Sequence, residues 1–105
     1  MPEGLAPPNC RVLGYSLARI TLEEATAWCL AQVRQPSPKL LVTLNPEIVV
    51  RAAAEAELRA ALLQADLTVA DGVGILWAAR QAGCRLPERV PGVDLATRLL
   101  ERGGS

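Results

Sequence analysis

Two short polar segments carry residue types that could support chemistry. The segment DGVG, at 71–74, follows an apolar run and precedes a helix-like pattern, and TLNPE, at 43–47, follows a second apolar run. Asp71, at a strand end beside apolar residues, could be poised as a general base. The chain contains no histidine, so carboxylates are the main candidates for that role. Gly72 and Gly74 would let a ligand approach the backbone closely.

Each polar residue also has a purely structural explanation. Aspartate is a common N-cap, and Asp-Gly is an ordinary turn sequence. Asn45 before Pro46 fits an N-cap followed by proline at the first helical position. The dipole of a first helical turn would stabilise Glu47, and Thr43 is typical of a strand. Taken one at a time, these residues favour the structural explanation, and DGVG is not the G-x-G-x-x-G fingerprint of dinucleotide binding.

Strands that alternate with helices are expected to position both segments. The apolar pattern predicts strands at 11–15, 40–44 and 67–70, and helices at 21–33, 47–65 (with a break near 54–55), 74–82 and 93–102. Thr21 and Glu24 form a capping-box pattern, and Gly83 fits a C-terminal cap. The alternation predicts an α/β fold with a parallel sheet and flanking helices. Ligands bind beyond the carboxyl ends of such strands, so both segments should line one edge.

The composition indicates one small globular domain. Of the 105 residues, 50% are hydrophobic and 3% are aromatic, so leucine, valine, isoleucine and alanine should form the core. The 11 basic and 11 acidic side chains balance, which argues against nucleic acid as a partner. No apolar run approaches the roughly 20 residues of a membrane-spanning helix. Residues 1–10 are expected to be a disordered leader, and 11–105 the α/β domain.

The cysteines and tryptophans are expected to be structural. Cys10, Cys29 and Cys84 are scattered and form no C-x-x-C pair. This spacing predicts reduced cytosolic thiols packed as small core residues, rather than a disulfide framework or a metal site. Trp28 and Trp77 both fall on apolar helix faces, so both are expected in the core.

Three longer stretches, taken together, resemble a known family. LVTLNPEIVVRA, ADLTVADGVGILWAAR and LPERVPGVDLATRLLE are similar, in order and spacing, to the N-terminal part of the WecG/TagA/CpsF glycosyltransferases, from about residue 11 to the end of the chain. The resemblance implies a Rossmann-like, mostly parallel sheet and an inverting glycosyltransferase without a metal or other cofactor. Such enzymes move a sugar of the N-acetylmannosamine type from a UDP-sugar to a polyprenyl-diphosphate-linked acceptor, in teichoic acid or cell-surface polysaccharide synthesis.

The resemblance also implies roles for individual residues. Asp71 matches the proposed general base, which would deprotonate the acceptor hydroxyl. Thr43 and Asn45 match residues of the substrate pocket, and Arg89 matches an arginine that could hold phosphate or sugar. Further motif positions are expected to shape the site: Glu47, Gly72, Gly74, Gly92 and Asp94. From the residues alone, Arg89 could equally be an exposed loop arginine, and Asp94 could cap the last helix or fix the loop before it.

Length is the main departure from the family. Relatives are expected to be roughly twice as long, so the chain is interpreted as the N-terminal half of such an enzyme, with inactivity of this half alone as an open alternative. It would act in the cytoplasm, with peripheral contact at the inner face of the plasma membrane if the C-terminal half is present. The alternative is a non-catalytic short paralogue that binds a sugar or self-associates as a homo-oligomer. A half-Rossmann nucleotide-binding module is a weaker third hypothesis, because no phosphate-binding loop is visible.

Overall fold

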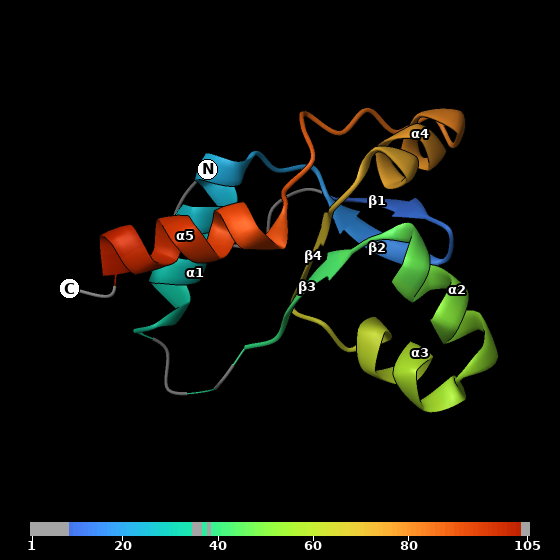
Figure 1. Cartoon of the computed structure of the whole chain (residues 1–105), viewed down its shortest axis with the longest axis horizontal. Coiled ribbons are helices and arrows are strands. Elements are labelled where there is room, and N and C mark those ends of the chain that lie inside the picture. Colours follow the sequence, from blue (N-terminus) through green and yellow to red (C-terminus); the bar gives the residue numbers. More distant parts are fainter. Residues whose placement is uncertain (1–8, 35–36, 38, 104–105) are drawn as a thin grey trace.

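Strands alternate with helices along most of the chain, which confirms the α/β prediction (Figure 1). The computed structural model describes residues 9–34, 37 and 39–103; the leader predicted at 1–10 therefore lies almost wholly outside the described residues. The elements are β1 (Asn9–Val12), β2 (Tyr15–Ala18), α1 (Leu22–Gln32), β3 (Leu41–Leu44), α2 (Pro46–Ala54), α3 (Ala56–Leu63), β4 (Leu67–Ala70), α4 (Val73–Gln81) and α5 (Gly92–Gly103).

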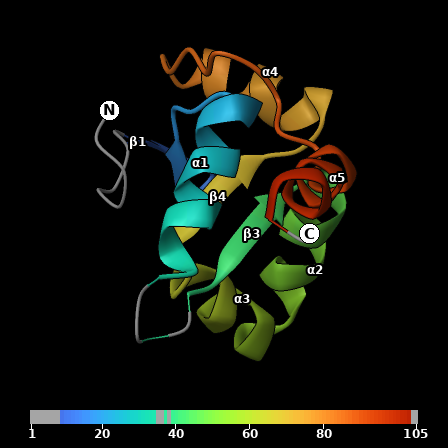
Figure 2. The same ribbon diagram turned by 90° about the vertical axis from the view of Figure 1, so that its left-hand side faces the viewer.

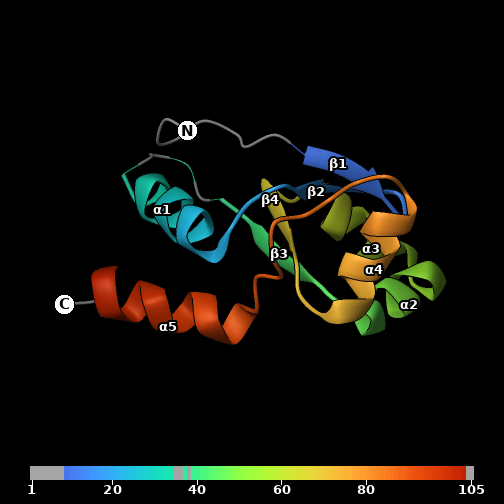
Figure 3. The same cartoon turned by 90° about the horizontal axis from the view of Figure 1, so that it is seen from above.

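The central pair of strands is parallel. β3 pairs with β4 in a register that places Leu41 beside Leu67 and Leu44 beside Ala70. Parallel neighbours require a crossover connection, which α2 and α3 supply. β2 lies alongside β4, with β1 beyond it (Figures 1 and 3). β4 is buried along its whole length, as expected for a strand covered on both faces, whereas β3 is only partly buried.

The single strand predicted at 11–15 is wrong, because those residues span a hairpin. β1 and β2 pair antiparallel, and Val12 lies beside Tyr15. Leu13 and Gly14 form the turn between them, with φ of 55° and 86°. Two consecutive positive φ values are typical of the tight hairpin turn whose twist matches that of the strands. Leucine rarely adopts this conformation, so the local sequence signals the turn only through Gly14.

The predicted capping box at the start of α1 is confirmed. The Thr21 side chain accepts a hydrogen bond from the Glu24 N–H at 3.1 Å, and the Glu24 carboxylate accepts one from the Thr21 N–H at 2.9 Å. These two bonds form the capping box of α1. The break predicted near 54–55 in the second helix is confirmed. It falls at Glu55, whose extended backbone separates α2 from α3. Pro36 and Pro38, which follow the helix predicted at 21–33, lie outside the described residues.

Helices cover the strands on two sides and create two apolar clusters. One cluster contains Leu44 and Ala70 of the parallel pair together with Ile75 of α4. The other contains Leu67 and Val69 of β4 together with side chains of α1 and α5. Residues of β4 thus alternate between the clusters, as the period of a strand requires. Figure 1 shows α1 and α5 on one side of the strands and α2 and α3 on the other, and in Figure 2 α1 and α5 lie toward the viewer.

Two predictions about the core need correction. Cys10 and Cys84 form a disulfide, with their Cα atoms 6.2 Å apart, so these thiols are not reduced. Trp28 is buried, as predicted, but Trp77 is 64% exposed. The buried face of α4 carries Ile75 and Ala79. Trp77 lies two positions from each of them and therefore falls on the opposite side of the helix.

Candidate active site

The two polar segments meet at the carboxyl ends of β3 and β4, as predicted. The parallel register sets Thr43 beside Val69 and Leu44 beside Ala70. The backbone N–H of Asp71 then donates a hydrogen bond to the Leu44 carbonyl at 2.8 Å. This bond continues the ladder one residue beyond the strands, and it places Asp71 next to the start of TLNPE.

Asp71 does not cap the helix that follows it. The N-cap of α4 is Gly72, which has no side chain to accept a capping bond. The Asp71 carboxylate instead accepts a hydrogen bond from the backbone N–H of Gly92, with Oδ2 3.3 Å from the nitrogen. Gly92 is the first residue of α5, and a helix N-terminus attracts negative charge. The half-buried carboxylate is therefore oriented by an element 21 residues away in the sequence.

Thr43 shares this contact with the start of α5. A Cβ atom built on Gly92 would lie 3.3 Å from Thr43 Oγ1, which is tighter than ordinary van der Waals contact. Glycine therefore allows α5 to begin directly against the threonine. A hydroxyl, a carboxylate and a helix N-terminus thus converge from three separate segments of the chain.

The two glycines of DGVG bring α4 against the start of α2. Gly72 has φ of 115° and ψ of 148°, a combination essentially restricted to glycine. A Cβ atom on Gly74 would lie 2.9 Å from Pro46 Cγ, so any side chain there would force a shift. The close approach sets the N-termini of α2 and α4 side by side at the strand-end edge, where backbone N–H groups favour anions and oxygen-rich ligands.

The other expected site residues lie near this edge with different surroundings. Asn45 is the N-cap of α2, because its Oδ1 accepts a hydrogen bond from the Ile48 N–H at 2.9 Å. Its amide nitrogen keeps its donor capacity for a ligand. Glu47 lies exposed in the first turn of α2. Asp94 lies exposed in the first turn of α5 and is not its capping residue.

Arg89 lies on a loop that is anchored on both sides of it. The Glu88 carboxylate accepts a hydrogen bond from the Leu22 N–H at 2.8 Å, and the Val90 N–H donates to the Ala70 carbonyl at 2.6 Å. Arg89 itself is exposed, and within the described residues no hydrogen bond joins it to the strand-end cluster. The structure thus fixes its backbone beside the edge and leaves its guanidinium accessible.

The sequence reasoning missed Glu88. Its partner lies 66 residues away, at the first turn of α1, so no local pattern pairs the two. The only available signal is that backbone N–H groups at a helix start need acceptors and that a carboxylate is a suitable one.

These features define an α/β protein with a strand-end edge suited to hydroxylated and anionic ligands, and with a half-buried carboxylate held at that edge by the start of α5. A model of the Glycosyl transferase WecG/TagA/CpsF family matches residues 10–105. The chain therefore belongs to this family, and the resemblance seen in the sequence is confirmed.

One curated relative is similar to part of the chain. It is the N-acetylglucosaminyldiphosphoundecaprenol N-acetyl-beta-D-mannosaminyltransferase of Bacillus spizizenii, 37% identical over 62 residues. The match covers 59% of this chain and 24% of that enzyme. The chain thus corresponds to a minor part of the relative's length.

Proposed function

We propose that this chain carries the acceptor-activating part of an inverting glycosyltransferase. The enzyme transfers an N-acetylmannosamine-type sugar from a UDP-sugar to a polyprenyl-diphosphate-linked acceptor, in the synthesis of teichoic acid or another cell-surface polysaccharide. Membership of the family and the activity for which the Bacillus relative is named support the reaction class. The observation that carries the proposal is the convergence of Asp71 and Thr43 on the N-terminus of α5.

Asp71 is proposed to act as the general base. Its hydrogen bond from Gly92 engages Oδ2, so Oδ1 is the atom that would receive the proton of the acceptor hydroxyl. The acceptor oxygen would form its bond to the anomeric carbon as the bond from that carbon to UDP breaks, and UDP would leave with the electron pair. A single displacement of this kind inverts the configuration at the anomeric carbon. Fixing the carboxylate in advance supplies the orientation that such a step requires.

The remaining residues at the strand-end edge are proposed to bind the substrates and to shape the site. The Thr43 hydroxyl and the Asn45 amide would hydrogen-bond to sugar or ribose hydroxyls, and the Arg89 guanidinium would contact phosphate. Within the described residues, no helix combines the length and apolarity needed to cross a bilayer. Because the proposed acceptor is lipid-linked, we propose that the enzyme works as a peripheral protein at the cytoplasmic face of the membrane.

Turnover by an Asp71→Asn variant tests the base. The assay would supply UDP-N-acetylmannosamine and a polyprenyl-diphosphate-linked N-acetylglucosamine, and would follow UDP release and product mass. Loss of the base should lower the rate roughly 100- to 10,000-fold. Glu57→Gln, an exposed change on α3, is the matched control and should retain full activity. Undiminished turnover by Asp71→Asn would exclude the general-base role.

A second candidate is a non-catalytic module that self-associates or binds a sugar. Large apolar side chains remain exposed on α5, with Val93 at 77% and Leu100 at 74%. They are seven residues apart and so lie on one side of the helix. Among the described strands, β3 pairs only with β4, so the other edge of β3 has no strand partner. Absence of turnover by the unmodified chain, together with concentration-dependent sedimentation, would favour this candidate; a monomer at all concentrations would count against self-association.

A further inference from the structure

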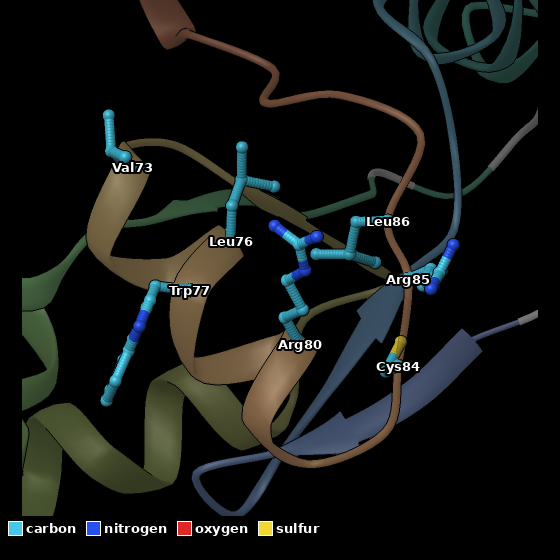
Figure 4. A pocket seen from close by; sticks show the side chains of 7 residues that line it. All are labelled: Val73, Leu76, Trp77, Arg80, Cys84, Arg85 and Leu86. Atoms are coloured by element: carbon cyan, nitrogen blue, oxygen red, sulfur yellow. The ribbon is translucent and has the colours of Figure 1, made fainter.

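A groove separate from the strand-end cluster lies between α4 and the segment that follows this helix. It encloses about 320 Å³, a volume in the range of small-molecule sites. Figure 4 shows Leu76 of α4 and Leu86 of the following segment on opposite walls. Cys84 also lines the groove, and it is bonded to Cys10 of β1. Cys84 is only 5% exposed, so the groove is the route by which a small solute would reach its sulfur.

The groove carries positive charge beside the disulfide. Arg80 lines it from α4, and Arg85 lines it from the loop wall (Figure 4). Both arginines are close to Cys84 along the backbone. Arg85 is the next residue, and the Cys84 N–H donates a hydrogen bond at 2.8 Å to the carbonyl of Ala79, which precedes Arg80. The disulfide and the two cationic side chains therefore share one small cavity.

The positive charge of the groove is not neutralised by a nearby carboxylate. Within the described part of the chain, neither Arg80 nor Arg85 forms an ion pair, and residues 72–87 contain no acidic residue. The Glu88 carboxylate is engaged at the start of α1, where it accepts a hydrogen bond from the Leu22 N–H at 2.8 Å. Guanidinium groups in this position attract a small anion and stabilise thiolates formed beside them.

The disulfide lies at the beginning of the segment that reaches the strand-end cluster. From Cys84 the chain continues to Val90, whose N–H donates to the Ala70 carbonyl at 2.6 Å. It then reaches Gly92, whose N–H donates to the Asp71 carboxylate at 3.3 Å. Opening the disulfide would remove the covalent tie between this segment and β1. A redox change at the bond would therefore act on the segment whose far end positions Asp71.

We propose that this groove is the entry site for a small thiol that carries a carboxylate, and that such a thiol exchanges with the Cys10–Cys84 disulfide there. The carboxylate of the entering thiol would form a charge-assisted hydrogen bond with Arg80 or Arg85. This assignment goes beyond the proposed function and does not depend on it, because it concerns only the redox state of the disulfide.

The exchange follows the ordinary course of thiol–disulfide chemistry. The thiolate of the entering molecule attacks Cys84 Sγ, and a new S–S bond forms while the bond to Cys10 breaks. Cys10 leaves with the electron pair as a thiolate and takes up a proton from water. A second molecule of the thiol then attacks the sulfur of the first and releases Cys84 as a thiolate. Two small thiols are thereby oxidised to one small disulfide, and their two electrons reduce the protein bond.

The rates at which two matched thiols reduce the folded chain test the proposal. The probes are mercaptoacetate and its neutral amide, mercaptoacetamide, compared at equal thiolate concentration. After quenching in acid, unfolding and alkylation, the intact mass should show one adduct for the oxidised chain, on Cys29, and three for the reduced chain. The ratio of the two rates on the chain unfolded in urea gives the intrinsic reactivity. Folding should raise the ratio in favour of mercaptoacetate at least about fivefold at low ionic strength, and high salt should suppress this gain.

Substitution of the two arginines locates the effect. The double variant Arg80→Gln, Arg85→Gln should lose most of the gain, with a smaller effect on the amide, whose thiolate bears a single negative charge. Both arginines are exposed, so the urea midpoint of the oxidised double variant should match that of the unmodified chain. Arg34→Gln is the matched control and should keep the gain, because this exposed arginine follows α1, whose C-terminal end lies across the molecule from α4 (Figure 1).

Four results would overturn the assignment. Reduction of the disulfide only after urea unfolds the chain would show that the groove does not admit a thiol. A rate ratio in the folded chain equal to that in the unfolded chain, or a ratio unchanged in the double variant, would show that the arginines do not select the carboxylate. Loss of the gain in Arg34→Gln would assign the effect to net charge. Asp71→Asn should leave the ratio unchanged, so the exchange site and the general base are tested by different variants.

Discussion

Reduction of the Cys10–Cys84 disulfide should remove a large share of the folding stability. The bond joins residues with a sequence separation of 74. For a loop of this length, the chain-entropy relation gives about 4.5 kcal/mol of stabilisation at 25 °C. Measured contributions are commonly about 2–4 kcal/mol. Because small domains have only about 5–15 kcal/mol of net stability, the reduced chain should unfold at a clearly lower urea concentration.

The location of the disulfide adds to this effect. It ties β1 to the segment after α4, and Cys84 is buried in the core cluster that contains Leu44 of β3. The same segment continues to Gly92, which contacts Asp71. Cytosolic proteins are generally kept reduced, so the stability of the reduced form decides whether the proposed function is possible in that compartment.

Urea denaturation followed by circular dichroism, with and without reductant, measures the effect. The free energy of unfolding should fall by about 2–4 kcal/mol on reduction. A Cys10→Ser, Cys84→Ser double variant should unfold identically with and without reductant, whereas Cys29→Ser should stay sensitive to it. Burial raises the pKa of the Cys29 thiol, so that thiol should react slowly with alkylating reagents in the folded chain. Intact masses that differ by two hydrogens would show that the bond had been reduced. If the urea midpoints of the oxidised and reduced chains were then identical, the loop-entropy explanation would be refuted.

Three further substitutions test local features. Gly72→Ala should lower the free energy of unfolding by about 1–3 kcal/mol, because its backbone conformation is essentially restricted to glycine; an unchanged urea midpoint would contradict this. Glu88→Ala removes the acceptor for the Leu22 N–H and should cost about 0.5–2 kcal/mol in thermal unfolding, while Glu88→Gln, which keeps an acceptor oxygen, should restore most of it. The hydrogen bond and charge of Arg102 lower the pKa of Glu23. The ion pair between the two residues therefore stabilises the fold above the unfolded-state pKa of Glu23, and this stabilisation is lost as pH falls through the folded-state pKa of Glu23. Glu23→Gln should therefore lower Tm at neutral pH and not in strong acid, and a difference that persists in acid would disprove the ion-pair account.

Local sequence signals were sufficient wherever the physical cause is local. The capping box of α1 uses residues three positions apart, and Asn45 caps α2 through Ile48, also three positions away. The buried strand β4 follows from a continuous apolar run. Because parallel strands end at one edge, even the meeting of TLNPE and DGVG could be predicted before their contact was known.

Local signals failed where partners are distant or where two faces of one helix look alike. Both sides of α4 carry apolar residues, so the pattern could not show that Ile75 is buried and Trp77 exposed. The hairpin turn places Leu13 at a positive φ that its own preferences do not suggest.

The sequence by itself determined the alternation of strands and helices, the helix caps and the family, because these depend on residue type and short spacing. Only the tertiary structure decided what surrounds Asp71. Its carboxylate contacts Gly92, across 21 residues, and Glu88 reaches α1 across 66. Cys10 meets Cys84 across 74. Contacts at such separations arise because whole helices and strands pack against one another. The energy of that packing is spread over many side chains, so the residues that end up in contact carry no local signal of it.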